Sequence, residues 1–281
     1  MIEFDHVTKK YGATLALDDL SLTIDTPGIY CLLGRNGAGK TTFLKSLAGH
    51  IPISTGKIEV DRHTVTPLTM SQDVHFVETD AAQFNIRLFD LFKDAQEVNP
   101  NFDAAFARDA ANRFKLDTHK RYKHLSFGMK AMVNTLIALS SGKDILLLDE
   151  PVLGFDPVMR RTFYDMLGQC CAGGEKTVIV STHIIDEIEK TADRLIVIDK
   201  GGVILFCDIA EVDEKAYTVT GLADDVIAAT QGLNVLNETK VGGFLSRSVF
   251  DKRIPPDDKL TISAMSLNDF FVALVGDKEG E

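Results

Sequence analysis

Apolar residues recur in short runs along most of the chain, separated by polar and glycine-rich segments. Extended runs are predicted near residues 2–7 and 20–24, and a continuous apolar run at 29–33 ends abruptly in glycines, after which a helix is predicted from 40 to about 49. Further apolar runs occupy 145–148, 178–180 and 195–198. Each lies near a stretch with helical spacing, and this alternation predicts a buried parallel sheet in an α/β fold.

The spacing of apolar residues becomes helical from about residue 80 to 138. Phe84, Leu88, Leu91 and Phe92 are spaced as one face of a helix, so a helical insert between strands is predicted here. Whether its phenylalanines, including Phe89, belong to the core or to a docking surface is left open by the sequence.

The character of the chain changes again after about residue 211. Strands are predicted at 216–220, 234–238 and 259–263, and helices near 224–230 and 267–275. We therefore expect a domain over 1–210 and a small α+β appendage over 211–281. The appendage could bind a regulator, help dimerisation or cover a sheet edge, and the sequence does not choose among these roles.

Composition narrows the function classes. A formal net charge of −11 argues against a protein that binds a nucleic-acid backbone, which needs a basic surface. The four cysteines show no zinc-ligand spacing and are interpreted as reduced core thiols. The N-terminus has no secretory pattern and no stretch has the length of a spanning helix, so we expect a cytoplasmic chain.

A phosphate-binding loop is predicted where the apolar run at 29–33 meets the following helix. Residues 34–41 read GRNGAGKT and fit the pattern G-x-x-x-x-G-K-[ST]. Glycines let backbone N–H groups turn towards phosphate oxygens, and the helix N-terminus adds further donors. Lys40 is expected to reach the outer phosphates and the Thr41 hydroxyl to coordinate Mg²⁺. The predicted contacts are Gly34, Asn36, Gly37, Ala38, Gly39, Lys40, Thr41 and Thr42. The alternative is a glycine-rich turn that binds nothing.

Two acidic residues end the apolar run at 145–148. Asp149 and Glu150 are predicted at the carboxyl end of a buried strand, the edge of an open α/β sheet at which ligands bind. Asp149 can hold Mg²⁺, and Glu150 can accept a proton from an attacking water. Alone, the pair could simply close a strand in solvent.

His183 follows the run at 178–180 in the same way. A lone histidine is more often a packing or surface residue. Beside the other motifs, it is interpreted as a partner that contacts the terminal phosphate and helps Glu150 to position water.

With these motifs in order, residues 125–130, which read LSFGMK, complete a resemblance to the ATPase subunits of ATP-binding cassette (ABC) transporters, covering about residues 1–210. The usual signature in that family is LSGGQ, so Ser126 and Gly128 are kept while Phe127 and Met129 differ. Tyr11 matches the family's aromatic platform for adenine. Asp156, in the segment 153–157, matches the family's loop after the catalytic carboxylate, which contacts the opposing subunit. Ser126, Gly128 and Asp156 are therefore also predicted to contact nucleotide.

One family element is replaced. A glutamine is expected at the end of the strand before the helical insert, and none occurs there before Gln83. Glu78 is the best substitute. A carboxylate adds negative charge where an amide is neutral, which leaves open how this position responds to Mg²⁺ and the γ-phosphate.

The resemblance implies a P-loop ATPase with a mixed sheet core that uses ATP and Mg²⁺. It works as a head-to-tail pair with a second ATPase subunit, which is either another copy of this chain or a paralogue. The resemblance also implies separate membrane-spanning transporter subunits as partners, a position at the inner face of the cell membrane, and an export-like role. The alternatives are a soluble ABC ATPase that remodels a complex, and a regulatory module with little hydrolysis. The chain has one phosphate loop and a modest helical insert, and both features oppose the first alternative. It has both Glu150 and His183, which opposes the second.

Overall fold

A six-stranded sheet gathers the apolar runs of the sequence. The structure, a computed structural model, describes residues 1–78 and 85–276. The sheet has the order β10-β9-β3-β8-β7-β6. Its strands are β3 (Gly28–Leu33), β6 (Val74–Glu78), β7 (Ile145–Asp149), β8 (Thr177–Ser181), β9 (Arg194–Asp199) and β10 (Gly202–Asp208). The neighbours from β9 to β6 pair in parallel, so their carboxyl ends share one edge, as the sequence predicted.

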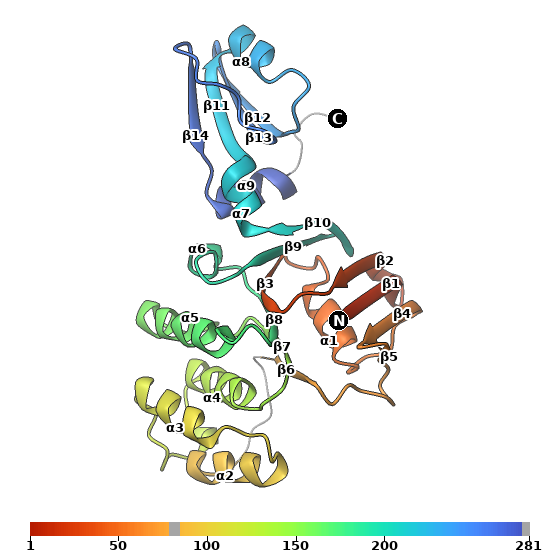
Figure 1. Cartoon of the computed structure of the whole chain (residues 1–281), viewed down its shortest axis with the longest axis vertical. Helices are drawn as coiled ribbons and strands as arrows, with labels where there is room; N and C mark the ends of the chain where they lie inside the picture. Colours follow the sequence, from red (N-terminus) through yellow and green to blue (C-terminus); the bar gives the residue numbers. More distant parts are fainter. Residues whose placement is uncertain (79–84, 277–281) are drawn as a thin grey trace. The chain divides into compact units, whose positions relative to one another are not determined.

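The mixed sheet core that the resemblance implied is confirmed, because a second sheet is antiparallel; its strand order was not predicted. Its order is β2-β1-β4-β5, and its strands are β1 (Ile2–Tyr11), β2 (Thr14–Ile24), β4 (Thr55–Val60) and β5 (His63–Thr64). Helix α1 (Lys40–Leu47) lies between the two sheets (Figure 1). Phe43 of α1 stacks on Phe4 of β1 at 4.4 Å between ring centroids, and residues of both sheets and α1 form one buried cluster. This packing fixes the helix that begins at the phosphate loop.

Helices cover the other face of the six-stranded sheet (Figure 1). They are α4 (Phe127–Leu139), α5 (Pro157–Cys171) and α6 (Ile185–Ile188). The helices α2 (Leu88–Val98) and α3 (Ala104–Arg113) lie beyond α4, with α3 packed against α4, and a 3₁₀ turn spans Tyr122–His124. Within the predicted helical insert, Leu88 is fully buried while Phe89 is 61% exposed. Leu91 and Phe92 are half-buried, and Phe84 lies outside the described residues. Phe89 is therefore not a core residue.

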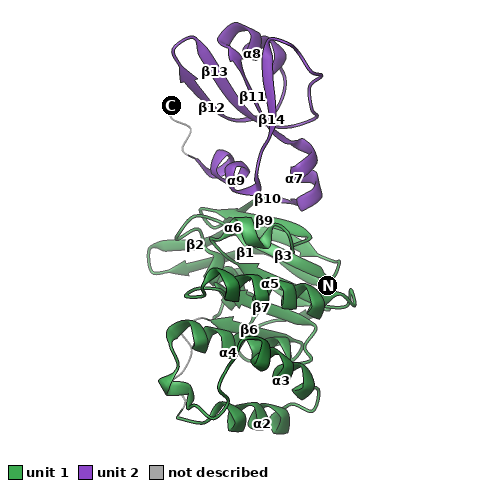
Figure 2. Ribbon diagram, turned by 90° about the vertical axis from the view of Figure 1, so that its left-hand side faces the viewer, with its two compact units in different colours: residues 1–205 green, residues 206–281 purple. Residues whose placement is uncertain are grey.

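The chain divides into two compact units, 1–205 and 206–281 (Figure 2). The predicted boundary after residue 210 lies within α7 (Ile209–Lys215), inside the second unit. That unit has an antiparallel sheet of order β12-β13-β11-β14, so the expected α+β character is confirmed. Its elements are α7 (Ile209–Lys215), β11 (Ala216–Leu222), α8 (Ala223–Ala229), β12 (Val235–Val241), β13 (Phe244–Phe250), β14 (Leu260–Ala264) and α9 (Leu267–Val275).

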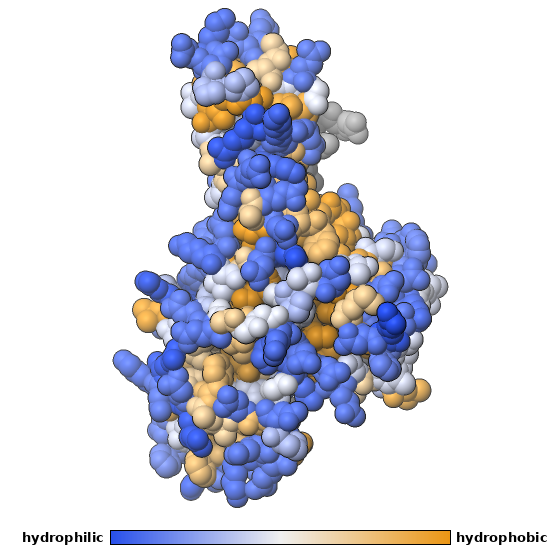
Figure 3. Space-filling model, viewed as in Figure 1, coloured by the Kyte–Doolittle hydropathy of each residue, from blue (hydrophilic) through white to orange (hydrophobic). Residues whose placement is uncertain are grey.

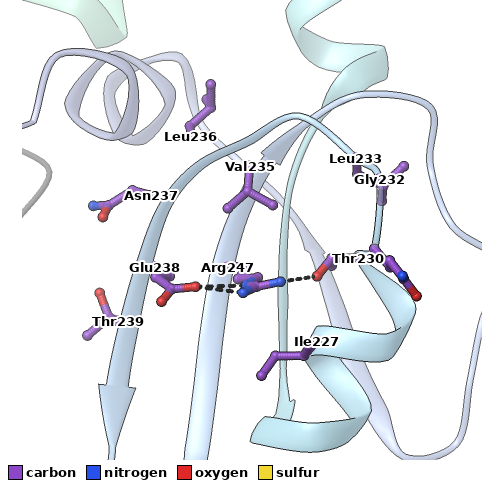
Figure 4. A pocket seen from close by; sticks show the side chains of 11 residues that line it. Ile227, Thr230, Gly232, Leu233, Val235, Leu236, Asn237, Glu238, Thr239 and Arg247 are labelled. Carbon is purple, nitrogen blue, oxygen red and sulfur yellow. Dashed lines mark hydrogen bonds and ion pairs between the residues drawn. The ribbon is translucent and has the colours of Figure 1, made fainter. Parts of the chain in front are cut away.

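The second unit contains a cavity of about 860 Å³ beside β12 and the end of α8 (Figure 4). Arg247 is among the residues that line it. The Arg247 guanidinium donates to Glu238 through Nε at 2.9 Å and to the Thr230 hydroxyl through Nη1 at 2.8 Å. These bonds tie β13 to β12 and to the end of α8.

Hydrophilic residues predominate on the face shown in Figure 3, with apolar areas between them.

All four cysteines are free, but only Cys31 is fully buried, so the expectation of four core thiols was too broad. In the described part of the chain, no helix has the length and apolar character needed to span a membrane.

Candidate functional site

The loop between β3 and α1 adopts a backbone that requires glycine. Gly37 and Gly39 have φ angles of 82° and 112°, which L side chains rarely adopt. A Cβ on Gly39 would lie 2.4 Å from the carbonyl oxygen of Ala16. Since α1 begins at Lys40, its first N–H groups are directed into this loop. The loop therefore has the geometry of an anion cradle.

Lys40 lies across its own loop. Its Nζ donates to the carbonyl oxygen of Gly34 at 2.7 Å and reaches that of Arg35 at 3.4 Å. Burial lowers the pKa of Lys40, and the carboxylates of Glu150 and Asp149 oppose this effect. The ammonium is thus held between the loop and the acidic end of β7.

Asp149 connects α1 to two strands of the sheet. Its Oδ2 accepts a hydrogen bond from the Thr41 hydroxyl at 2.7 Å, and its Oδ1 accepts one from the Ser181 hydroxyl at 2.5 Å. Hydroxyl and carboxylate oxygens at a phosphate loop are the donors that suit Mg²⁺, which binds through one or two carboxylates and substrate phosphates. Thr41 and Asp149 therefore fit the group that the sequence assigned to them.

Glu150 follows β7 with an unusual backbone. Its φ angle is 49°, in the left-handed region, and its N–H donates to both the carbonyl and the hydroxyl oxygen of Ser181 at 3.1 Å. Its Oε2 lies 2.8 Å from Nδ1 of His183, and the two side chains are 24% and 57% exposed. A carboxylate held by an imidazole at a solvent-accessible edge can take up a proton from water.

Tyr11 lies at the end of β1, and the residue is 48% exposed. The Nζ of Lys9 is 4.7 Å from the ring centroid, and the same ammonium donates to the carbonyl oxygen of Pro52 at 2.6 Å. The ring is therefore accessible and has a cation beside it, which is compatible with stacking on a base.

The segment around Ser126 begins α4. The Ser126 hydroxyl accepts a hydrogen bond from the N–H of Met129 and caps the helix. Gly128 approaches Gly154 so closely that a Cβ on Gly128 would lie 2.4 Å from the Gly154 carbonyl oxygen. The Phe127 ring lies over Gly154 and is half-exposed. The two segments that the resemblance assigned to the partner interface thus contact each other.

Asp156 is a helix cap in this structure. Its Oδ1 accepts hydrogen bonds from the N–H groups of Val158 and Met159, both at 2.9 Å, at the start of α5. A contact of Asp156 with nucleotide stays a prediction.

Two contributions at this edge were missed from the sequence. Ser181 holds both Asp149 and the backbone of Glu150. Its position directly after the apolar run at 178–180, as Asp149 follows 145–148, was an available signal. An ion pair between Lys45 and Glu78 was also missed, because its members are distant in sequence.

Comparison with known proteins decides the family. A family model described as "ABC transporter" matches residues 17–153. The ABC transporter ATP-binding protein YtrB of Bacillus subtilis is 26% identical over 251 residues, covering 87% of this chain and 85% of that protein. The Nod factor export ATP-binding protein I of Burkholderia orbicola is 30% identical over 265 residues, covering 85% of this chain and 84% of that protein.

The chain belongs to the family of ABC transporter ATP-binding proteins. ATP hydrolysis is the characteristic activity of this family, so the predicted class of enzyme is confirmed. Solved ABC cassettes share the fold. A dimeric ATP-binding cassette bound to ADP and Pi superposes with a TM-score of 0.64 at 20% identity, over 74% of this chain and 99% of that one.

Proposed function

We propose that this ABC ATPase binds Mg²⁺-ATP at the loop 34–41, hydrolyses it, and powers export through separate membrane-spanning subunits. The observation that carries the proposal is the meeting of four groups at one sheet edge. Thr41 contacts Asp149, and Glu150 contacts His183, each within hydrogen-bond distance. Phosphoryl transfer to water requires a phosphate loop, a metal-binding pair and a base with its partner.

Each group has a distinct role in the proposal. The backbone N–H groups of the loop bind the phosphates, and Lys40 exchanges its carbonyl partners for the outer phosphate oxygens. Glu150 accepts a proton from the attacking water at Oε, while His183 fixes that carboxylate and faces the terminal phosphate. Mg²⁺ held by Thr41 and Asp149 would neutralise charge on the phosphates.

Tyr11 and the Ser126 segment complete the proposed nucleotide site. Tyr11 offers one ring face to adenine, a contact of about 1 kcal/mol that reads little of the base. The hydroxyl of Ser126 and the first N–H groups of α4 form a helix N-terminus suited to an anion. In a head-to-tail pair, this segment meets the γ-phosphate bound to the partner subunit, so the nucleotide joins the two subunits.

A groove on the helical region supports a membrane partner. It has a volume of about 420 Å³ and extends from β6 to α2 and α4. Its lining includes Phe76, Glu78, Leu91 and Val98, and Val98 is 85% exposed. A helix from a membrane subunit that docks here would contact Glu78, at the edge that carries Asp149, and so sense the nucleotide state.

Export is the direction that the relatives favour, since one relative is a Nod factor export ATP-binding protein. The proposed location is the inner face of the cell membrane. A soluble ABC ATPase that remodels another complex remains the competing function, and it predicts soluble partners instead of membrane chains.

The test uses Glu150→Gln protein, which should keep ATP bound, recovered from gently solubilised membranes of its own cell. We expect a multi-spanning membrane chain to co-purify with ATP and to be released with ADP. Lys40→Ala protein, impaired in ATP binding, is the matched control and should not retain that chain. Recovery of soluble assemblies alone, with the protein absent from membranes, would reject the transport role.

A further inference from the structure

Three parallel strands end side by side at the proposed nucleotide site. In the register of β6, β7 and β8, Glu78 lies opposite Asp149, and Asp149 lies opposite Ser181. Residues opposite each other in neighbouring strands point to the same face of a sheet. Glu78, Asp149 and Ser181 therefore form one row of side chains, and two of the three are carboxylates.

Helix α1 faces this row with two residues one turn apart. Thr41 and Lys45 are four positions apart, so they lie on the same side of the helix. Thr41 donates to Asp149 at 2.7 Å, and the Nζ of Lys45 lies 2.5 Å from Oε1 of Glu78. The contact between Lys45 and Glu78 therefore resembles that between Thr41 and Asp149. It lies on the neighbouring strand, β6, and its donor is an ammonium instead of a hydroxyl.

The Lys45 ammonium offsets the negative charge of Glu78. Two adjacent carboxylates repel each other, and both repel a polyphosphate that arrives without a metal ion. The Lys45 side chain is only 27% exposed, so solvent screens its charge less than that of a fully exposed lysine. Lys45 gives this position the near-zero net charge that an amide would have.

We propose that Lys45 is a positioning residue that neutralises Glu78 and thereby sets how strongly nucleotide binding depends on Mg²⁺. The inference rests on the proposed ATP site at loop 34–41. Without Lys45, the second carboxylate stands uncompensated beside Asp149. ATP without a metal then meets more repulsion, whereas Mg²⁺-ATP, which carries less negative charge, is affected less.

The test is the ratio of two dissociation constants of ATP, one in EDTA and one with saturating Mg²⁺, measured by calorimetry on the whole chain. Lys45→Met should raise this ratio roughly three- to tenfold, as expected for one uncompensated charge within about 10 Å of the phosphates. Glu78→Gln should lower it by a similar factor, because the ammonium is then uncompensated. The double variant Lys45→Met with Glu78→Gln should return to within about twofold of the wild-type ratio, and Lys45→Arg should match the wild type.

A merely structural role for the pair changes both dissociation constants alike and leaves the ratio constant, which would overturn the inference. Glu78→Gln keeps the shape of the side chain, so it provides the decisive ratio even where Lys45→Met does not fold. Failure of the proposed function itself is distinguishable, since the wild-type chain would then bind ATP in neither buffer.

Discussion

The close approach of Gly128 to Gly154 gives a prediction whose sign is unusual. Alanine normally favours a helix over glycine by up to about 1 kcal/mol, so Gly128→Ala in α4 should stabilise the protein if propensity alone decided. The structure predicts the opposite. The added Cβ would lie 2.4 Å from the Gly154 carbonyl oxygen and 3.0 Å from its carbonyl carbon, and both atoms belong to the backbone.

The magnitude follows from the displacement required. Restoring an ordinary contact of about 3.4 Å needs the two segments to separate by nearly 1 Å, an overpacking that typically costs about 1–3 kcal/mol. With the helix gain of up to about 1 kcal/mol subtracted, we expect a net loss of up to about 2 kcal/mol. For a unit of this size that corresponds to a fall in Tm of up to roughly 8 °C.

Gly168→Ala is the matched control. Gly168 lies in α5, and its added Cβ would meet only the Thr191 methyl at 3.7 Å, an ordinary contact. This variant should gain about 0.5–1 kcal/mol. Both glycines lie in the first unit, so scanning calorimetry should show the same transition moving in opposite directions. Equal or upward shifts for both variants would refute the steric reasoning.

Three further predictions concern the chemistry of the site. Glu150→Gln should reduce phosphate release about 10²- to 10⁴-fold while ATP affinity is retained, and wild-type turnover in this variant would remove Glu150 as the base. Ser181→Ala should lower kcat more than ATP affinity, because Asp149 and the Glu150 backbone both lose a partner; kinetics with unchanged kcat would contradict this role. Tyr11→Ala should weaken ATP binding about fivefold to tenfold and leave kcat unchanged, whereas Tyr11→Phe should bind as the wild type, as titration of a fluorescent ATP analogue can check.

The sequence predicted the buried elements well because their patterns are continuous. The apolar runs at 29–33, 145–148 and 178–180 became β3, β7 and β8 with small changes in their bounds. The helix predicted at 267–275 is α9 with the same bounds. The strands β3, β7 and β8 are buried along nearly their whole length, so composition alone marks them, whereas α9 is buried on one face only.

Half-exposed strands were harder to predict. The strand β4 reads TGKIEV, and β13 reads FLSRSVF, so charged and hydroxyl residues interrupt both apolar patterns. Neither was predicted. The strand order of the second sheet of the first unit was also not predicted, because its pairings join segments that are distant along the chain, such as Ile2 with Val60.

At the site, too, the sequence predicted local motifs but not contacts between distant segments. The loop 34–41 and the pair Asp149 and Glu150 are local motifs with a known mechanism. The ion pair between Lys45 and Glu78 depends on how α1 packs against β6, and no local pattern specifies that contact. The left-handed backbone of Glu150 is similarly a consequence of its hydrogen bonds to the neighbouring strand.

The central claim is that ATP joins two copies of this ATPase and that hydrolysis separates them. Sedimentation of the purified Glu150→Gln chain tests it most directly, with Lys40→Ala as the control that should stay single. The account predicts a particle of twice the chain mass with Mg²⁺-ATP and a single chain with ADP. A Glu150→Gln chain that binds ATP yet stays single, or that pairs equally well with ADP, would contradict the account.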